Sequence, residues 1–327
     1  MKRFLAIILL VSMALLTFAG CSGGNAKDNK VVIYASTEEY RNEYYAKRLK
    51  EKFPDYTVSI EYMSSGNQAA KLLAEGTSSE GDISIDLEYG YVDKLSDVLA
   101  DLSSYDYSIY AEDMLLEGKK VIPWTRNGGC IVVNPAVLAS KNLEEPKTYE
   151  DLLKPEYKGL ISMPSPKSSG TGYMFVKSLV NAWGEEEAFD YFDKLSANIL
   201  HFTSSGSGPV NDLVKGETAI GLGMIAQTVT EINNGVDLKM LFFEEGAPYS
   251  TYGIAMVKGK EQKKAVKEVF DFFVSDLLPE DKERFYPEKV LKDKDFVIEN
   301  YPTNIKYADM SNNTASEKER LLEKWKY

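Results

Sequence analysis

The sequence predicts an α/β fold of two lobes, each lobe being a mainly parallel β-sheet flanked by helices. The chain has 327 residues, which is more than one hydrophobic core usually spans, so two lobes are expected. Short apolar runs alternate with amphipathic segments, as in the right-handed β-α-β units that build parallel sheets. The alternation starts a second series near residue 121, which is expected to form the second lobe.

The first series begins with a continuous apolar run, followed by a segment in which apolar and polar residues alternate with the period of a strand. Its predicted strands are 31–35, 56–62 and 82–87. Ser36 and Glu39 are placed as a capping box for the first helix. Ser65 and Gln68 form a second predicted capping box, before a helix at 69–74.

The second series begins with two short predicted strands, 121–123 and 130–133, on either side of a turn at 124–129. Thr148 and Asp151 are expected to cap a helix. Further strands are predicted at 159–163, 198–202, 218–222, 238–243 and 253–257. Further helices are predicted near 173–182, after Pro209, after Gly223, and at 264–274 and 317–325.

The first segment of the chain is typical of an export signal. Two basic residues, an apolar run at 4–18 and the pair Ala19-Gly20 precede Cys21. This pattern resembles a bacterial lipobox, although Phe18 stands where that motif prefers leucine; an ordinary secretory signal is the alternative. Residues 1–20 are therefore predicted to be a lipoprotein signal peptide, with Cys21 acylated as a membrane anchor and 21–30 a flexible tether.

Composition excludes several classes of protein. Hydrophobic residues make up 44% of the chain and charged residues 27%, as in ordinary globular proteins. The 38 Lys and Arg residues against 50 Asp and Glu residues give a net charge of −12, which argues against nucleic-acid binding. Two cysteines exclude a disulfide scaffold, and His201 is the only candidate for a histidine base. No metal site and no cofactor are expected.

Three turns that follow predicted strands are rich in Ser, Thr and Gly: 64–67, 165–172 and 203–208. Free backbone N–H groups, hydroxyl donors and the positive end of a helix favour an anion there. Alternatively, these residues are only good caps and turn formers. The candidate binding residues from these turns and the first strand end are Ser36, Thr37, Ser65, Gly66, Ser168, Ser169, Gly170, Thr171, Ser205, Gly206 and Ser207.

Arg126 and Asn127 lie where the second series begins. If the chain crosses between the lobes there, Arg126 can reach the cleft and hold an oxyanion with two hydrogen bonds. An exposed loop arginine is the alternative.

Acidic residues also stand at or just beyond predicted strand ends, where they could hold the hydroxyls or the amine of a ligand, or be solvated caps. These residues are Glu38, Glu39, Asp86, Glu88 and Glu245. Glu88 and Glu245 are the candidates from this set. Glu245 is favoured because Gly246, Tyr249 and Tyr252 surround it, and Tyr249 is a candidate with it.

Several segments together resemble a known family. They are Ser204-Ser-Gly-Ser-Gly-Pro-Val-Asn-Asp-Leu-Val-Lys-Gly-Glu217, Ala219-Ile-Gly-Leu-Gly-Met224, Glu245-Gly-Ala-Pro-Tyr249, Asp82-Ile-Ser-Ile-Asp86 and Tyr149-Glu-Asp-Leu-Leu-Lys-Pro155. Through them, most of residues 31–325 resemble the type II periplasmic solute-binding proteins of ABC importers. The cluster in question binds ferric ions, thiamine, phosphonates and sugar phosphates.

The resemblance implies a type II periplasmic-binding-protein fold whose lobes are joined by hinge strands. Lobe 1 would span 31–125 and lobe 2 would span 126–250. Residues 251–327 would return to lobe 1, with C-terminal helices packing across both lobes.

The resemblance also separates the ligand classes. Ferric-ion binders of this cluster carry two adjacent tyrosines where this chain has Ile225-Ala226-Gln227, which argues against iron. Organophosphate-binding relatives use polar residues at that place together with the glutamate of the Glu-Gly turn. Gln227 and Glu245 are therefore candidates, although Ala226-Gln227 replaces a His-Asp pair. The expected ligand is an anion with hydroxyls or an amine, such as a phosphonate or a sugar phosphate.

The implied function is capture of a small solute in the cleft and its delivery to an ABC permease, without enzymatic activity. The chain would be a monomer, anchored by lipid to the outer side of the cell membrane or in a periplasm. Binding of ferric ion or thiamine on the same fold is one alternative. An exported hydrolase or transferase is another, against which the single His201 and the lack of a G-x-S-x-G pattern count.

Overall fold

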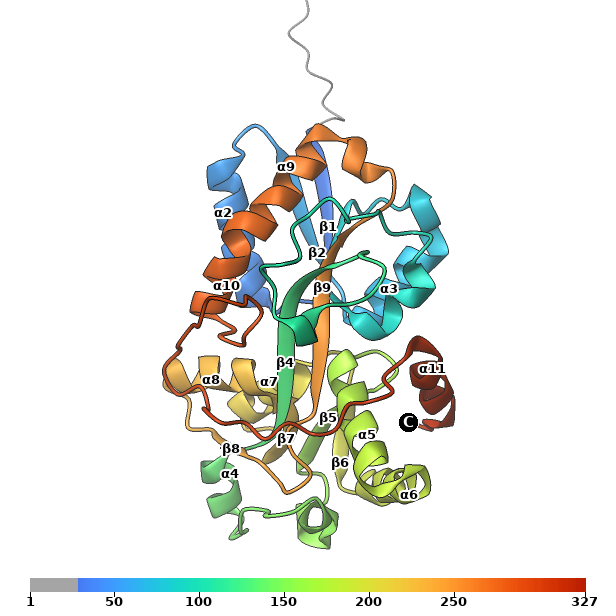
Figure 1. The fold of residues 1–327 in the computed structure, drawn as a ribbon. Coiled ribbons are helices and arrows are strands. Elements are labelled where there is room, and N and C mark those ends of the chain that lie inside the picture. Colours follow the sequence, from blue (N-terminus) through green and yellow to red (C-terminus); the bar gives the residue numbers. More distant parts are fainter. Residues whose placement is uncertain (1–28) are drawn as a thin grey trace, which may run out of the picture.

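The computed structural model describes residues 29–327, which form two α/β lobes joined by two long strands (Figure 1). Each lobe contains parallel strand pairs with helices packed on them, so the predicted fold class is confirmed. The predicted signal at 1–20, the lipidation site Cys21 and most of the tether at 21–30 lie outside the described residues. Within residues 29–327, no helix combines the length and apolar character needed to cross a bilayer.

Lobe 1 is built on β1 (Lys30–Ala35), which lies between β2 (Thr57–Tyr62) and β3 (Ile83–Glu88) and runs parallel to both. Helices α2 (Glu39–Lys52) and α3 (Ser65–Glu75) connect these strands. All residues of β1 except the first are buried, as its continuous apolar run predicts.

The two capping boxes predicted in lobe 1 are wrong. The Ser36 hydroxyl donates to the backbone carbonyl of Asp86 (2.6 Å) instead of capping α2. The Gln68 amide donates to the carbonyls of Tyr34 (2.8 Å) and Ile85 (3.1 Å) instead of returning to the start of α3. In both cases the side chain donates to backbone carbonyl groups of the neighbouring sheet instead of capping its helix.

Two strands form the hinge, β4 (Ile122–Val133) and β9 (Tyr249–Met256), and both run from one lobe into the other (Figure 1). The first part of β4 pairs antiparallel with β9, and residues 129–133 pair with a strand of lobe 2. The predicted turn at 124–129 is therefore wrong. Trp124 anchors this segment in the core of lobe 1, and the polar residues after it are held extended because β9 supplies their backbone partners.

Lobe 2 contains a parallel group in which β5 lies between β6 and β7, and β7 and β8 pair with β4. Its strands are β5 (Ile161–Pro164), β6 (Ile199–Thr203), β7 (Ile220–Met224) and β8 (Lys239–Leu241). Its helices are α4 (Pro135–Ser140), α5 (Gly170–Trp183), α6 (Glu185–Leu195), α7 (Gly208–Lys215) and α8 (Ile225–Asn233). Helices α4 and α6 were not predicted, although α6 buries Ala188, Tyr191, Phe192 and Leu195 at helical spacing.

The helix expected after Thr148 is only a 3₁₀ turn, Glu150–Leu153. The predicted capping contact exists, since the Asp151 N–H donates to the Thr148 hydroxyl (3.1 Å). Pro155 follows too closely for the turn to lengthen, because the residue before a proline disfavours the helical conformation. The other 3₁₀ turns are Gly76–Ser78, Tyr89–Tyr91, Asp93–Leu95, Glu112–Met114, Pro155–Tyr157 and Lys260–Gln262.

The C-terminal part of the chain packs on both lobes. Helix α9 (Lys264–Phe272), the π-helical stretch Phe273–Leu277 and α10 (Leu278–Arg284) contribute to the core of lobe 1. The chain then returns to lobe 2 and ends after α11 (Ala315–Lys324), beyond which Trp325 enters the core of lobe 2.

Candidate functional site

A narrow cavity lies between the lobes and is lined from both sides. We call it the inner cavity; the residues that line it are Ser36, Glu38, Tyr62, Ser64, Ser65, Asp86, Asn127, Ser169, Gly170, Thr171, Gly206, Ser207, Met224 and Tyr252. The candidates that the structure brings together here are Ser36, Ser65, Asn127, Ser169, Gly170, Thr171, Gly206 and Ser207.

Helix N-termini form the donor side of the inner cavity. Helices α3 and α5 begin at Ser65 and Gly170, and these starts meet, since the Gly170 N–H donates to the Ser65 hydroxyl (3.2 Å). The turn before α7 lies against α5 so closely that a Cβ at Gly206 would be 2.2 Å from Thr171 Oγ1. First-turn N–H groups and helix dipoles thus converge on one space, which favours an anion.

The serines at these helix starts are not used as caps. The N-cap residues Ser64, Ser169 and Ser207 make no side-chain capping hydrogen bond. Ser64 Oγ is buried without a partner, and Ser207 Oγ lies 3.0 Å from Ser205 Oγ. The hydroxyls therefore remain available to a solute, which favours the anion interpretation of these turns over the interpretation as simple caps.

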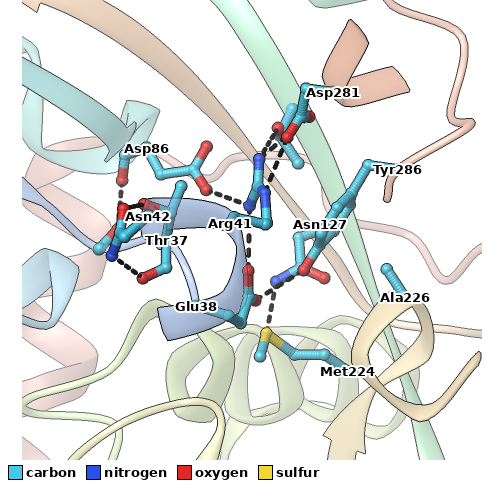
Figure 2. Close-up of polar contacts among 12 residues, drawn as sticks. Thr37, Glu38, Arg41, Asn42, Asp86, Asn127, Met224, Ala226, Asp281 and Tyr286 are labelled. Carbon is cyan, nitrogen blue, oxygen red and sulfur yellow. Dashed lines mark hydrogen bonds and ion pairs between the residues drawn. The ribbon is translucent and has the colours of Figure 1, made fainter. Parts of the chain in front are cut away.

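The opposite wall of the inner cavity presents carboxylates held by Arg41 (Figure 2). The buried Arg41 guanidinium donates to Glu38 Oε2 (3.1 Å), Asp86 Oδ2 (2.9 Å) and Asp281 Oδ1 (2.9 Å). Tyr286 also donates to Glu38 (2.7 Å). This network fixes Glu38 and Asp86 at the edge of the cavity.

Two oxygens on this wall have no partner. Asp86 Oδ1 and Asn127 Oδ1 are buried acceptors without a donor, although Asn127 Nδ2 donates to Met224 Sδ (2.8 Å). Burial raises the pKa of Asp86 to about 6, against the opposing effect of Arg41. A buried acceptor without a donor costs about 1–3 kcal/mol, so a solute hydroxyl or amine at this wall would be stabilised.

A second, wider cavity of about 860 Å³ adjoins the inner cavity, and Glu38, Tyr62 and Ser207 line both. We call it the vestibule. Its remaining lining residues are Glu39, Tyr40, Asn42, Glu43, Ile60, Ser205, Asn211, Gln227 and Glu231. The candidates Ser205 and Gln227 therefore belong to the vestibule rather than to the inner cavity.

Three candidates from strand ends and hinge are occupied by other contacts. The Arg126 guanidinium lies over the Tyr249 ring (5.3 Å to its centroid) and is paired with Asp113. Glu88 is buried in an ion pair with Lys318 of α11. Neither Arg126, Glu88 nor Tyr249 lines the inner cavity or the vestibule.

The remaining candidates also lie outside both cavities. Thr37 donates to the Asn42 side chain, and Ser168 donates to the Ser204 carbonyl (3.0 Å). Gly66 faces the backbone of 167–168 across the lobe boundary. Glu245 lines a separate cavity of lobe 2 together with Tyr149 and Trp183.

Six residues of the inner cavity were not among the candidates: Glu38, Tyr62, Ser64, Asp86, Met224 and Tyr252. Glu38 and Asp86 belong to the acidic residues noted at strand ends, from which Glu88 and Glu245 were chosen instead. Ser64, Tyr62 and Met224 each lie at a strand end or a helix start, so their positions in the sequence could have identified them as candidates. Tyr252 lies within β9, and only the pairing of β9 with β3 and β4 directs its side chain to the cavity. Among residues 29–327, no group of three or more His, Cys, Asp or Glu side chains is arranged to hold a metal ion.

Comparisons with known proteins agree with this architecture. An uncharacterised protein of Haemophilus influenzae is 29% identical over 289 residues, covering 84% of this chain and 81% of that protein. The phosphoglycerate transport regulatory protein PgtC of Salmonella typhimurium is 24% identical over 149 residues, which are 46% of this chain and 37% of PgtC.

Among solved structures, the periplasmic binding protein AfuA of Actinobacillus pleuropneumoniae, with exogenous fructose-6-phosphate bound, superimposes with a TM-score of 0.80. It is 26% identical, over 90% of this chain and 97% of AfuA. Residues 86–313 match the family described as bacterial extracellular solute-binding proteins. This match spans both lobes and most of the inner cavity, and the chain belongs to that family, the solute-binding proteins of ABC importers.

Proposed function

We propose that the solute is a small organic anion that also carries hydroxyl groups, a sugar phosphate or a related organophosphate, held in the inner cavity. The observation that carries this proposal is the division of the cavity into two walls. Helix starts and uncapped serines supply donors for an anion on one side. Asp86 Oδ1 and Asn127 Oδ1 supply unpartnered acceptors for hydroxyls on the other. The fructose 6-phosphate bound to AfuA has both kinds of group.

Iron is another ligand class that this family suggests. The adjacent tyrosines of this chain, Tyr44 and Tyr45, donate to Glu280 (2.8 Å) and to Asp281, respectively. Both hydroxyls are thus engaged in lobe 1, and neither residue lines a cavity of the cleft. The inner cavity offers hydroxyls and helix starts instead, which suit an oxyanion better than a bare ferric ion.

The direct test is calorimetric titration of residues 22–327 with fructose 6-phosphate, fructose and inorganic phosphate. Because the two walls act on different parts of the solute, fructose 6-phosphate should bind at least about tenfold more tightly than either fragment. A ligand at about 100 times its dissociation constant should also raise the free energy of unfolding by about 2.7 kcal/mol. Equal affinity for fructose and fructose 6-phosphate would show that the helix starts do not bind the phosphate.

We also propose that Cys21 is acylated, so that the protein stays at the membrane beside its permease. Two or three acyl chains would anchor it stably, since each buried CH₂ contributes about 0.8 kcal/mol. Replacement of Cys21 by Ala should release the protein from the membrane fraction or leave an uncut precursor. Unchanged fractionation of that variant would contradict the lipid anchor.

A further inference from the structure

The vestibule is negatively charged. Glu38, Glu39, Glu43 and Glu231 line it, and no Lys or Arg does so within the described residues. Glu38 is paired with Arg41 (3.1 Å), whereas no ion pair is found for the other three in residues 29–327. Burial raises the pKa of Glu231, as expected for a carboxylate that loses water without gaining a cation.

Gln227 on α8 provides an independent observation. Its side chain is 3% exposed, and its Nε2 donates to the Ser207 carbonyl (3.3 Å) and to Asn211 Oδ1 (2.9 Å). These two acceptors fix the orientation of the side-chain amide, so its oxygen is the atom that makes no hydrogen bond. That oxygen, Oε1, is buried and has no hydrogen-bond partner, although the residue lines the vestibule. The vestibule therefore contains an unpartnered acceptor as well as carboxylates, and no Lys or Arg of the described residues lines it.

This arrangement is unfavourable for a solute that is only anionic. Like charges repel each other, and they do so more strongly near a protein surface than in bulk water. A phosphate that enters the inner cavity through the vestibule must pass Glu43 and Glu231. An ammonium group on the solute would reverse the sign of that interaction and supply the missing donor for Gln227.

We propose that the vestibule is a subsite for a protonated amine, so that the natural solute is zwitterionic. The anionic phosphate or phosphonate lies at the helix starts of the inner cavity, and the ammonium lies among Glu43, Glu231 and Gln227. This inference rests on the function proposed above and adds the class of the second group on the solute.

The experiment compares two matched pairs of probes by calorimetric titration at low ionic strength. The pairs are glucosamine 6-phosphate with glucose 6-phosphate, and 3-aminopropylphosphonate with propylphosphonate. The amine-bearing member of at least one pair should bind about tenfold more tightly than its partner. The preference should weaken in high salt, because exposed charges are screened beyond about 3 Å at 1 M ionic strength.

The double variant Glu43→Gln/Glu231→Gln should lose this preference and keep its affinity for the amine-free member. The control, Glu144→Gln/Glu156→Gln, removes two exposed carboxylates of lobe 2 that line neither cavity, and should retain the preference. Melting curves establish that both variants fold. Equal affinity within both pairs, or a preference that survives in the vestibule variant, overturns the amine subsite and leaves the proposed function standing. Failure of all four probes and of fructose 6-phosphate to bind the unmodified protein overturns both.

Discussion

Asp86 lies within β3 and has a φ of 52°, a left-handed conformation that costs a non-glycine residue about 1–3 kcal/mol. The pairing of β3 with β9 shifts register between Ser84 and Leu87, so the strand is locally irregular at this residue. Arg41 holds one carboxylate oxygen at 2.9 Å, and the other has no partner. The irregular backbone thus presents a free carboxylate oxygen to the inner cavity, as binding sites often do with local strain.

The raised pKa of Asp86 predicts how stability varies with pH. Its pKa of about 6 lies above the ordinary value of about 3.9, so between these limits the folded state binds more protons than the unfolded state. The contribution of this group is therefore fully present below about pH 4 and is lost as the pH rises through about 6. The free energy of unfolding of the unmodified protein, minus that of Asp86→Asn, should fall by about 2 kcal/mol from pH 4 to pH 7. Urea unfolding at a series of pH values measures this difference; a flat difference would contradict the assignment.

Ser207 lies at the start of α7 and lines both the inner cavity and the vestibule. Ser207→Asp should abolish binding of fructose 6-phosphate, because it places a negative charge where the phosphate belongs and competes for the same N–H groups. The fold should survive, since aspartate is itself a good N-cap. Ser316→Asp is the matched control, because it adds the same charge in the first turn of α11, outside both cavities. Calorimetry with melting curves compares the two, and undiminished affinity of Ser207→Asp would place the anion elsewhere.

At the scale of elements, the sequence predicts structure well where the partner of a residue lies nearby in the chain. The run 31–35 and the alternation at 56–62 become β1 and β2, because period and burial are local patterns. The helix start after Pro164 and the one after Thr203 are likewise marked by their own Ser and Gly residues. Pairing with a distant strand has no such local sequence signal. The extended segment around Arg126 and Asn127 therefore resembles a turn in the sequence, although it pairs with β9 in the structure.

Helix α11 bridges the two lobes through one buried lysine. Lys318 forms an ion pair with Glu88 of lobe 1, and its ammonium lies over the rings of Tyr91 in lobe 1 (3.9 Å) and Tyr173 in lobe 2 (4.5 Å). Trp325, just after the helix, is buried in lobe 2. The helix is therefore anchored on lobe 2 and inserts its charge into lobe 1.

Lys318→Met should destabilise the protein by about 3–5 kcal/mol, because it leaves the Glu88 carboxylate buried without a cation. The double variant Lys318→Met/Glu88→Gln should recover most of the lost stability, since no charge is then left unpaired. Urea unfolding of the single and double variants gives the coupling energy. The exposed pair Lys194 and Asp190 is the control, for which a coupling of only about 0.3–0.5 kcal/mol is expected. A similarly small coupling for Lys318 and Glu88 would show that the buried pair does not join the lobes.

At the scale of the whole molecule, the site exists only where the lobes meet. Ser65 comes from lobe 1, Gly170 and Ser207 come from lobe 2, and Asn127 comes from the hinge. The three Ser- and Gly-rich turns could be predicted from the sequence, because each is a local strand-to-helix turn. The sequence could not show that Glu245 and Tyr249 lie away from the cavity, because their position depends on which side of the hinge the turn before β9 faces.

A solute that contacts both lobes favours their closure. Its binding free energy must differ between the open and closed states to shift that equilibrium.

A cross-link between the lobes tests this closure. A Cβ at Gly170 would lie 3.1 Å from Ser65 Oγ, close to the spacing of about 3 Å between the Cβ of one cysteine and the sulfur of the other in a disulfide. The variant Ser65→Cys/Gly170→Cys should therefore form a disulfide when the lobes are closed, after a small shift of the Tyr252 hydroxyl, which would lie 2.8 Å from the new Cβ. The native Cys130 should not interfere, because it is buried and burial raises the pKa of its thiol.

The rate of cross-linking reports the population of the closed state. A solute that still binds this variant should accelerate disulfide formation, since it increases the closed fraction before oxidation. Once formed, the disulfide should hold the lobes together, so small-angle scattering should give a radius of gyration that no longer responds to added solute. Reduction should restore that response. Equal oxidation rates with and without a solute that calorimetry shows to bind would mean that binding does not draw the lobes together, and that the cleft is already closed in the free protein.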